Sequence, residues 1–436
     1  MAQTIFIAKE SHAAEKRVAG SPETVKKLAA RGFSIIVEKG AGVASGISDN
    51  AFADMGAQIG SAADANKADI ILRVRRPNAG ETKAMKSGAA VFAAMDPYGA
   101  EADVAAMGKA GLSAFAMEFM PRITRAQSMD ILSSQANLAG YRAVIDGAEQ
   151  YGRALPMMMT AAGTVPAAKV FVMGVGVAGL QAIATARRLG AIVTATDVRP
   201  ATKEQVESLG AKFLAVEDDE FKQAQTAGGY AKEMSKDYQA KQAELTAAHI
   251  AKQDIVITTA LIPGRPAPRL VTKEMVAAMK TGSVLIDLAV ERGGNVEGAK
   301  LGQIVETNGV KIVGYENVPG RIAASASLLF AKNLFTYLET MISKENVFAI
   351  PMDDELVKAT LLTHGGQVVH PNFAKAETAA TPKAAIAKAA PVKKASVAKA
   401  TVVKSAAKPA EKTPTAKKPV AKKPTISKPA AKGAKA

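Results

Sequence analysis

The stretch VFVMGVGVAGLQAIATARRLGAIVTATD, residues 170–197, contains a predicted strand, a glycine-rich turn, a helix and a second strand. Gly174, Gly176 and Gly179 form a G-x-G-x-x-G pattern between the first strand and the helix. The first glycine permits a tight turn, the second lets the backbone approach a pyrophosphate, and the third lets helix and strand pack closely. In this context the pattern predicts a dinucleotide-binding unit rather than a purely structural turn.

An acid at the end of the second strand indicates which dinucleotide binds. Asp197 follows Gly179 by 18 residues, and a carboxylate there accepts hydrogen bonds from ribose hydroxyls and repels a 2′-phosphate. The unpaired N–H groups and the positive dipole end of the helix N-terminus face the pyrophosphate. We therefore predict NAD(H) rather than NADP(H), although Arg199, two residues further on, brings a positive charge to the same place.

Apolar runs alternate with helical stretches on both sides of this unit, which is typical of parallel α/β sheets. Before it stand TIFIA (4–8) and FSIIVEKG (33–40), and after it stand DIVITTA (254–260) and GSVLIDLAV (282–290). A chain of 436 residues is long enough for more than one core. We predict an α/β fold with two doubly wound, Rossmann-like parallel-sheet domains and a cleft between them.

The domain boundaries follow from the helices that connect these runs. A long helix begins near residue 133, and the apolar helix within 319–342 is expected to return the chain to the first domain. The first domain is therefore predicted to be discontinuous, with residues 1–132 and 318–373. The dinucleotide-binding domain takes residues 133–317.

Two charged segments depart from this pattern. The segment 217–250 is either a plain surface insertion or a mobile loop, since long loops in compact domains often act as lids. Residues 374–436 hold 16 lysines and two acids, and supply +14 of the formal net charge of +16. With seven prolines and no aromatic residue, this tail is predicted to be disordered. It is either a solubilising extension or a weak, non-specific contact for anions or a membrane surface, without specific nucleic-acid binding.

Three absences limit the class of protein. There is no cysteine, which excludes disulfides and thiolate metal sites, and we predict no metal. No apolar run reaches the length of about 18 residues that spans a bilayer. The N-terminus has no basic region followed by an apolar one, so no secretory signal is visible. We expect a cytoplasmic protein, and association with a membrane protein is compatible with these features.

Scarce histidine limits the type of reaction. The four histidines, His12, His249, His364 and His370, show no neighbouring acid in the sequence that would complete a catalytic pair. A dehydrogenase that acts on an alcohol or amine must move a proton as well as a hydride, usually through His or Lys. Hydride transfer between two nicotinamides requires only position and an exposed ring. The sequence favours this second reaction.

A cluster of polar residues follows the apolar run at 111–119. Within MPRITRAQSMD (120–130) and one turn beyond it stand Arg122, Arg125, Gln127, Asp130 and Ser133. From the residues alone, this cluster is either the solvated start of a helix or a polar clamp on a ligand.

Five motifs resemble those of the NAD(H)-binding components of proton-translocating NAD(P) transhydrogenases. They are MPRITRAQSMDILSSQANLAGYRAV, GVGVAGLQAIATARRLGA, TTALIPGRPAPRLV, SVLIDLAVERGGN and YENVPGRIAASASLLFAKNLFTYLE. The resemblance covers nearly all of residues 1–370, and the chain length implies the split form. It implies NAD(H) in the cleft, a homodimer, and hydride exchange with NADP(H) on a partner beta subunit. Protons would pass through a membrane-spanning subunit, which would also attach this chain to the cytoplasmic membrane.

The resemblance implies a role for each member of the polar cluster. Arg122 and Asp130 would pair or hold the nicotinamide carboxamide and ring, Gln127 would lie near the nicotinamide and its ribose, and Ser133 completes the catalytic group. The family's mobile loop falls on 217–250, where Tyr230 would close over the cofactor. The cofactor-binding residues predicted on these segments are Arg122, Ile123, Thr124, Arg125, Gln127, Ser128, Met129, Asp130, Ser133, Gly174, Val175, Gly176, Val177, Gly179, Asp197, Val198, Arg199, Gly229, Tyr230 and Leu261. Apart from the resemblance, Arg125 has only the role of a solvated residue at a helix start.

The same residues also resemble alanine dehydrogenase, beginning at EKRVAGSPETVKKL (15–28). The region of that enzyme's catalytic histidine falls on Met95 and Asp96, and the region of its substrate-side lysine falls on ILRVRRP (71–77), which has no lysine. The acid before Gly-Gly is Glu291 rather than aspartate. An amino-acid dehydrogenase is therefore the second hypothesis, and a non-catalytic NAD-binding scaffold with a nucleic-acid-binding tail is the third.

Overall fold

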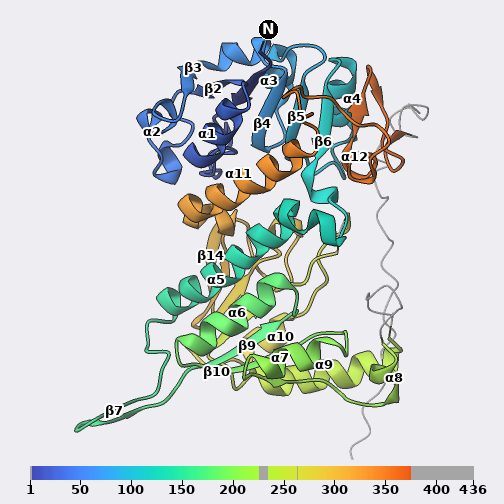
Figure 1. The fold of residues 1–436 in the computed structure, drawn as a ribbon. Helices are drawn as coiled ribbons and strands as arrows, with labels where there is room; N and C mark the ends of the chain where they lie inside the picture. Colours follow the sequence, from blue (N-terminus) through green and yellow to red (C-terminus); the bar gives the residue numbers. More distant parts are fainter. Residues whose placement is uncertain (1, 225–233, 263, 375–436) are drawn as a thin grey trace, which may run out of the picture. The chain divides into compact units, whose positions relative to one another are not determined.

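The structure is a computed structural model that describes residues 2–224, 234–262 and 264–374. Within these residues, two separate sheets of mostly parallel strands are flanked by helices, as Figure 1 shows. This confirms the predicted α/β class with two parallel-sheet domains. Gly229, Tyr230 and residues 375–436, which include almost all of the predicted tail, lie outside the described residues.

The first sheet has six parallel strands. Their spatial order is β3 (Ala57–Gly60), β2 (Ser34–Glu38), β1 (Thr4–Ile7), β4 (Ile70–Arg75), β5 (Ala90–Ala94) and β6 (Ser113–Ala116). Because β1 pairs with β2 on one side and with β4 on the other, the strand order reverses between β1 and β4. In open α/β sheets, ligands bind outside the carboxyl ends of the strands at this point of reversal.

Short helices connect the strands of the first sheet. They are α1 (Pro22–Ala30), α2 (Asp49–Ala53), α3 (Ala79–Ala84) and α4 (Glu101–Lys109). Helix α1 begins at Pro22, because Ser21 accepts a hydrogen bond from the Thr24 N–H and Pro22 occupies the first turn. Local side chains thus determine both the start of this helix and its direction away from the sheet.

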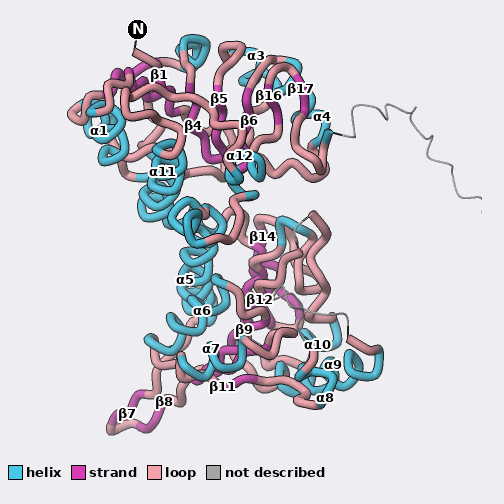
Figure 2. The backbone as a smooth tube through the Cα atoms, turned by 45° about the vertical axis from the view of Figure 1, so that its right-hand side comes forward, coloured by secondary structure: helices cyan, strands magenta, loops and turns pink. Residues whose placement is uncertain are grey.

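The second sheet has seven strands and carries the glycine-rich turn. Their spatial order is β11 (Lys212–Phe213), β10 (Ile192–Thr196), β9 (Lys169–Met173), β12 (Ile255–Thr258), β13 (Val284–Asp287), β15 (Val310–Gly314) and β14 (Gln303–Thr307). Only the edge strand β14 runs antiparallel. The helices of this sheet, visible in Figure 2, are α6 (Val177–Arg188), α7 (Thr202–Ser208), α8 (Asp219–Lys222), α9 (Lys236–Ile250) and α10 (Lys273–Ala277).

Two long helices, α5 (Ile131–Tyr151) and α11 (Ala323–Glu339), link the two cores. Helix α5 approaches α6 closely, since a Cβ on Gly140 would lie 2.0 Å from the carbonyl oxygen of Ala178. Helix α11 buries Phe330 and Leu334 in the core of the first sheet. Helix α12 (Glu355–Thr360) and the small hairpin β16 (Thr363–His364) and β17 (Gln367–Val368) follow α11.

The segment 217–250 differs from its prediction as an insertion or loop, because α9 occupies its second half. Ser235 caps this helix by accepting a hydrogen bond from the Tyr238 N–H at 3.1 Å. The helix is rich in Ala, Lys and Gln, which favour helices without an apolar stripe. Its buried residues, which include Tyr238 and Ile250, are too few to show helical periodicity in the sequence.

An exposed hairpin lies between α5 and β9 in the chain. It consists of β7 (Met158–Thr160) and β8 (Gly163–Val165), and every residue of both strands is exposed. Figures 1 and 2 both show this hairpin reaching away from the helices that flank it in the sequence. It was not predicted from the sequence, because its strands are only three residues long.

Candidate functional site

The turn between β9 and α6 has the geometry that a dinucleotide requires. Gly174 has a φ of +99°, which favours glycine, and a Cβ on Gly179 would lie 1.9 Å from the Gly174 carbonyl oxygen. A Cβ on Gly176 would meet nothing within 4 Å, so open space lies over the start of α6. Gly176 is also the N-cap residue and has no side chain to occupy the first N–H groups of the helix. These groups fit a pyrophosphate.

Asp197 lies at the carboxyl end of β10 and accepts four hydrogen bonds within the protein. Its Oδ2 accepts from the Val175 N–H at 2.7 Å and from Nη2 of Arg199 at 2.9 Å. Its Oδ1 accepts from the N–H and the Nε of Arg199, both at 2.9 Å. Hydrogen bonding to Asp197 raises the pKa of Arg199. Since a carboxylate has about four acceptor positions, ribose hydroxyls must displace the Arg199 side chain to bind Asp197.

The polar cluster after β6 forms a short helix and the start of α5. Residues Thr124–Met129 form the 3₁₀ helix η4, and Asp130 is the N-cap of α5. Asp130 accepts hydrogen bonds from the Ser133 N–H at 2.9 Å and from the Ser133 hydroxyl at 2.6 Å. The interpretation as a helix start is therefore correct for these two residues. Among the described residues, Asp130 forms no ion pair with Arg122.

Contacts from distant parts of the chain hold η4 in place. Arg125 donates two hydrogen bonds to Asp354 at 2.8 and 2.9 Å and pairs with Glu355, both at the start of α12. Asn333 of α11 donates to the Ser128 carbonyl at 2.8 Å and accepts from the Ser134 hydroxyl at 2.7 Å. The structure thus gives Arg125 a tethering contact, and its predicted contact with the cofactor stays a prediction.

Arg122 and Gln127 remain available for a ligand. Both side chains are exposed, and neither has a hydrogen-bond partner within the residues that the structure describes. Thr124 is also exposed, whereas Ile123 is half-buried and Met129 lies in the core of the first sheet. Met129 could therefore contact a cofactor only through its main chain. The cluster thus combines η4, which contacts from α11 and α12 hold in place, with the exposed side chains of Arg122 and Gln127.

The remaining predicted residues lie around the glycine turn. Val177 and Val198 are exposed, while Val175 is buried in the second core. Leu261 is exposed in the loop after β12. Asn295, which was not predicted from the sequence, holds this loop by accepting from the Ala260 N–H and donating to its carbonyl. Its position directly after Gly-Gly in ERGGN was the available signal.

His12 has an acidic neighbour that was not predicted from the sequence. Its Nε2 lies 3.5 Å from Glu316, more than 300 positions away in the chain. Of the other histidines, His249 bonds Thr194 and packs against Phe171, and burial lowers its pKa. Burial likewise lowers the pKa of His370. These two contribute to packing rather than to proton transfer.

The positions that correspond to the acid/base groups of alanine dehydrogenase are engaged in internal pairs. Asp96 forms an ion pair with Arg292, and Glu291 accepts a hydrogen bond from the Asn317 N–H at 2.8 Å. Arg75 donates to Glu15 at 2.9 Å. None of these described positions holds a histidine or a lysine.

The comparisons with known proteins identify the family. The family model for the alanine dehydrogenase/PNT N-terminal domain matches residues 6–139, and that for the C-terminal domain matches residues 143–371. The chain therefore belongs to the alanine dehydrogenase/PNT family, a family of NAD(H)-binding dehydrogenases.

Individual relatives point to one branch of this family. The chain is 56% identical over 375 residues to the first part of NAD(P) transhydrogenase subunit alpha from Rhodospirillum rubrum, covering 84% of this chain and 98% of that protein. It is 47% identical over 372 residues to the protein of the same name from Rickettsia prowazekii, covering 84% and 96%. These relatives confirm the resemblance to transhydrogenases and support an oxidoreductase role.

Solved structures agree with this assignment. The crystal structure of transhydrogenase from Sinorhizobium meliloti has a TM-score of 0.78 and 66% identity, and the match covers 84% of this chain and 100% of that one. An L-alanine dehydrogenase has a TM-score of 0.72 at 26% identity, covering 86% and 99%. Alanine dehydrogenase is thus the more distant relative.

Two kinds of feature are absent from the described residues. None of the helices in the described part of the chain has the length and apolar character needed to cross a membrane. Within the same residues, no three His, Asp or Glu side chains come together as potential metal ligands.

Proposed function

We propose that this chain is the NAD(H)-binding subunit of a proton-translocating NAD(P) transhydrogenase. Hydride passes directly between NAD(H) on this chain and NADP(H) on a partner subunit. The observation that carries the proposal is the open space over Gly176 at the uncapped start of α6. Asp197 stands at the adjacent strand end, as an adenosine ribose requires. When bound, the nicotinamide supplies the carbon that gives or accepts the hydride.

The residues of the chain bind and orient the dinucleotide. The N–H groups at the start of α6 hold the pyrophosphate, and Asp197 binds the adenosine ribose after Arg199 moves aside. Arg122 and Gln127 bind the nicotinamide end. Asp130 and Ser133 hold the turn that carries these two side chains, so their role is positioning. One face of the ring stays open to the partner's nicotinamide, and the step itself moves no proton.

The quaternary assignments extend the same proposal. NADP(H) is bound by a beta subunit, protons cross the membrane in a membrane-spanning subunit, and this chain attaches to the cytoplasmic membrane through them. A homodimer is supported by the exposed apolar hairpin β7–β8. The boundaries 1–132 with 318–373 and 133–317 remain our proposal for the domains. Gly229, Tyr230 and the lysine-rich tail lie outside the described residues, and their predicted roles remain hypotheses.

The second candidate is an amino-acid dehydrogenase, which the His12–Glu316 pair favours because it could exchange a proton. The two candidates differ in a simple assay. The purified chain should not oxidise NADH with pyruvate and ammonium, and steady turnover there would establish the second candidate instead.

Three single substitutions test the proposed roles of Arg122, Gln127 and Asp130 at the nicotinamide end of the site. When the chain is mixed with an NADP(H)-binding partner domain, Arg122→Ala and Gln127→Asn should slow hydride transfer at least tenfold with little change in NADH affinity. Asp130→Asn keeps a good helix cap, so it should retain thermal stability and most of the activity. A large loss of activity in Asp130→Asn would show that its charge acts on the cofactor directly.

A further inference from the structure

Gln135 is a buried polar residue near the start of α5, two positions after Ser133, and it is only 8% exposed. Its side-chain amide joins α5 to two segments that lie far from it in the chain. The Oε1 accepts a hydrogen bond from Nη1 of Arg17 at 2.8 Å. The Nε2 donates to the Ala326 carbonyl of α11 and to the Ser134 hydroxyl, both at 3.2 Å. Because a guanidinium only donates and a carbonyl only accepts, the amide can take only one orientation.

Arg17 anchors this amide to the loop after β1. Its Nε and Nη2 donate to the two carboxylate oxygens of Glu15 at 2.8 and 2.7 Å. The Nε of Arg75 donates to the same carboxylate at 2.9 Å. The side chain of Glu15 is fully buried, and that of Arg17 is 9% exposed. A two-point pair of this kind fixes the plane of the guanidinium, and it therefore fixes the direction in which Nη1 meets Gln135.

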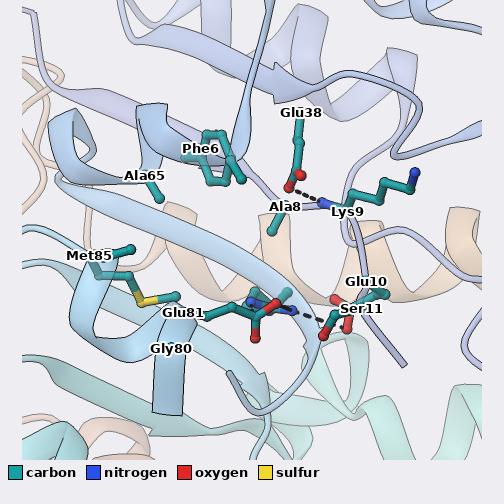
Figure 3. A pocket seen from close by; sticks show the side chains of 13 residues that line it. Phe6, Ala8, Lys9, Glu10, Ser11, Glu38, Ala65, Gly80, Glu81 and Met85 are labelled. Carbon is teal, nitrogen blue, oxygen red and sulfur yellow. Dashed lines mark hydrogen bonds and ion pairs between the residues drawn. The ribbon is translucent and has the colours of Figure 1, made fainter. Parts of the chain in front are cut away.

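The loop after β1 is itself held at both ends. At its start, Glu10, which Figure 3 shows in a close view, accepts a hydrogen bond from the Val74 N–H of β4 at 2.7 Å. At its end, the Val18 N–H donates to the hydroxyl of Ser327 at 3.0 Å. Ser327 directly follows the α11 residue whose carbonyl accepts from the amide. The amide and the loop therefore meet α11 at adjacent residues, and Arg17 has a fixed support.

From Gln135, side-chain hydrogen bonds continue to η4. The Ser134 hydroxyl, which accepts from Gln135, donates to Oδ1 of Asn333 at 2.7 Å. The Nδ2 of Asn333 donates to the Ser128 carbonyl of η4 at 2.8 Å. We call these four side chains, Arg17, Gln135, Ser134 and Asn333, the Gln135 network. The network ends at Ser128, the residue that follows Gln127 in the sequence.

A polar network at this place has a geometric consequence. Burying polar groups costs desolvation that an apolar side chain of similar size would avoid, whereas a fully bonded network selects one arrangement of its elements. Both N–H groups of the Gln135 amide are bonded, and its oxygen accepts from a charged donor. These bonds can form together only at one rotation of α5 about its axis. The network therefore determines where the first turn of α5 and the adjoining η4 lie.

We propose that Gln135 is a positioning residue for hydride transfer. It contacts neither Arg122 nor Gln127, but it fixes the segment that presents both side chains to the nicotinamide end of the site. This inference rests on the proposed function. Because the glycine turn and Asp197 hold the other end of the dinucleotide, loss of Gln135 should affect the rate of transfer more than the affinity for NADH.

Two variants interrupt the network at successive points. Gln135→Leu removes the amide at similar volume, and Ser134→Ala removes the hydroxyl that connects it to Asn333. In the mixture with an NADP(H)-binding partner domain, each should slow hydride transfer at saturating NADH at least about fivefold, because small displacements of positioning groups reduce rates strongly. The NADH dissociation constant should stay within about twofold of wild type. The double variant should be no slower than the slower single variant, since both interrupt the same network.

Val37→Ala is the matched control for lost stability, because Val37 is fully buried in the same core on β2 but lies outside the network. All variants are compared at a temperature at which thermal unfolding shows them folded, and Val37→Ala should then transfer hydride at the wild-type rate. A smaller loss than fivefold in either network variant, or an equal loss in Val37→Ala, would overturn the positioning role alone. If Gln135→Leu does not fold, Ser134→Ala decides. Absence of transfer by wild type would instead refute the proposed function, and this inference with it.

Discussion

We expect Asp197 and Arg199 to act in opposite directions on the choice of dinucleotide. Arg199 occupies three of the four hydrogen bonds that Asp197 accepts, and its charge lies where a 2′-phosphate would bind. Asp197→Ala should weaken NADH binding about tenfold and strengthen NADPH binding, because it removes the ribose acceptor and frees the guanidinium. Arg199→Ala should instead increase the preference for NADH.

Titration of each variant with both dinucleotides measures these changes, with Glu207→Ala in the neighbouring helix α7 as an exposed control. The same direction of change in both variants would contradict the opposed roles.

At the same scale, the sequence allowed prediction of residues whose partners are close in the chain. The glycine turn and the Ser21 cap each depend on residues within a few positions of one another, so the residue types alone indicate a turn and a helix start. Arg125 pairs with Asp354, 229 positions away. His12 likewise contacts Glu316, which is also distant in the chain. Such contacts depend on how the chain returns to the first sheet, which no local pattern encodes.

The segment that carries Arg122 and Gln127 includes η4, which the side-chain amide of Asn333 contacts. Asn333→Ala would remove the side-chain donor to the Ser128 carbonyl and one acceptor of the Ser134 hydroxyl, which also bonds the Ile131 carbonyl. Loss of such partly buried hydrogen bonds costs about 1 kcal/mol each. We expect a lower free energy of unfolding and slower hydride transfer, because η4 is less firmly held. Thermal unfolding and the transfer assay measure both, with Ser325→Ala on the exposed side of α11 as control. Unchanged transfer in a destabilised variant would show that η4 does not need this support.

Elements differed in how well the sequence revealed them. The buried strands and α6 were predicted because continuous apolar runs and the glycine pattern mark them. Helix α9 was missed because it contacts the core through few residues, and propensity alone is a weak signal. The hairpin β7–β8 buries none of its residues, so no burial pattern marks it.

At the scale of the whole molecule, Glu15 should make the free energy of unfolding depend on pH in acid solution. Burial alone would raise its pKa, but hydrogen bonds from Arg17 and Arg75 outweigh burial and lower it from 4.5 to about 2. A lowered folded-state pKa stabilises the protein above about pH 4.5, and this stabilisation is lost as the pH falls toward 2. Glu15→Gln should therefore lower the free energy of unfolding by about 3 kcal/mol at pH 7.

The difference between wild type and Glu15→Gln should shrink toward zero near pH 2, as measured by denaturant unfolding at several pH values. A difference that does not depend on pH would indicate a packing defect rather than the loss of the charge.

We expect the exposed hairpin β7–β8 to lie in the interface between two copies of the chain. Met159 is 77% exposed and Met158 is 43% exposed, and exposed apolar groups of this kind mark interaction surfaces. The double substitution Met158→Ser and Met159→Ser should weaken the proposed homodimer at least tenfold, as seen by light scattering across a dilution series. Thr164→Ala in the same hairpin is the control. A dimer of unchanged strength would place the interface elsewhere.

Direct hydride transfer is the central claim, and isotope transfer tests it most directly. The chain would be loaded with NADH that carries deuterium at both positions of the reactive nicotinamide carbon, and mixed with a partner domain that holds NADP⁺. We predict that the deuterium appears in NADPH, with none released to the solvent. Deuterium in the solvent, or no transfer although both dinucleotides are bound, would contradict the proposed function.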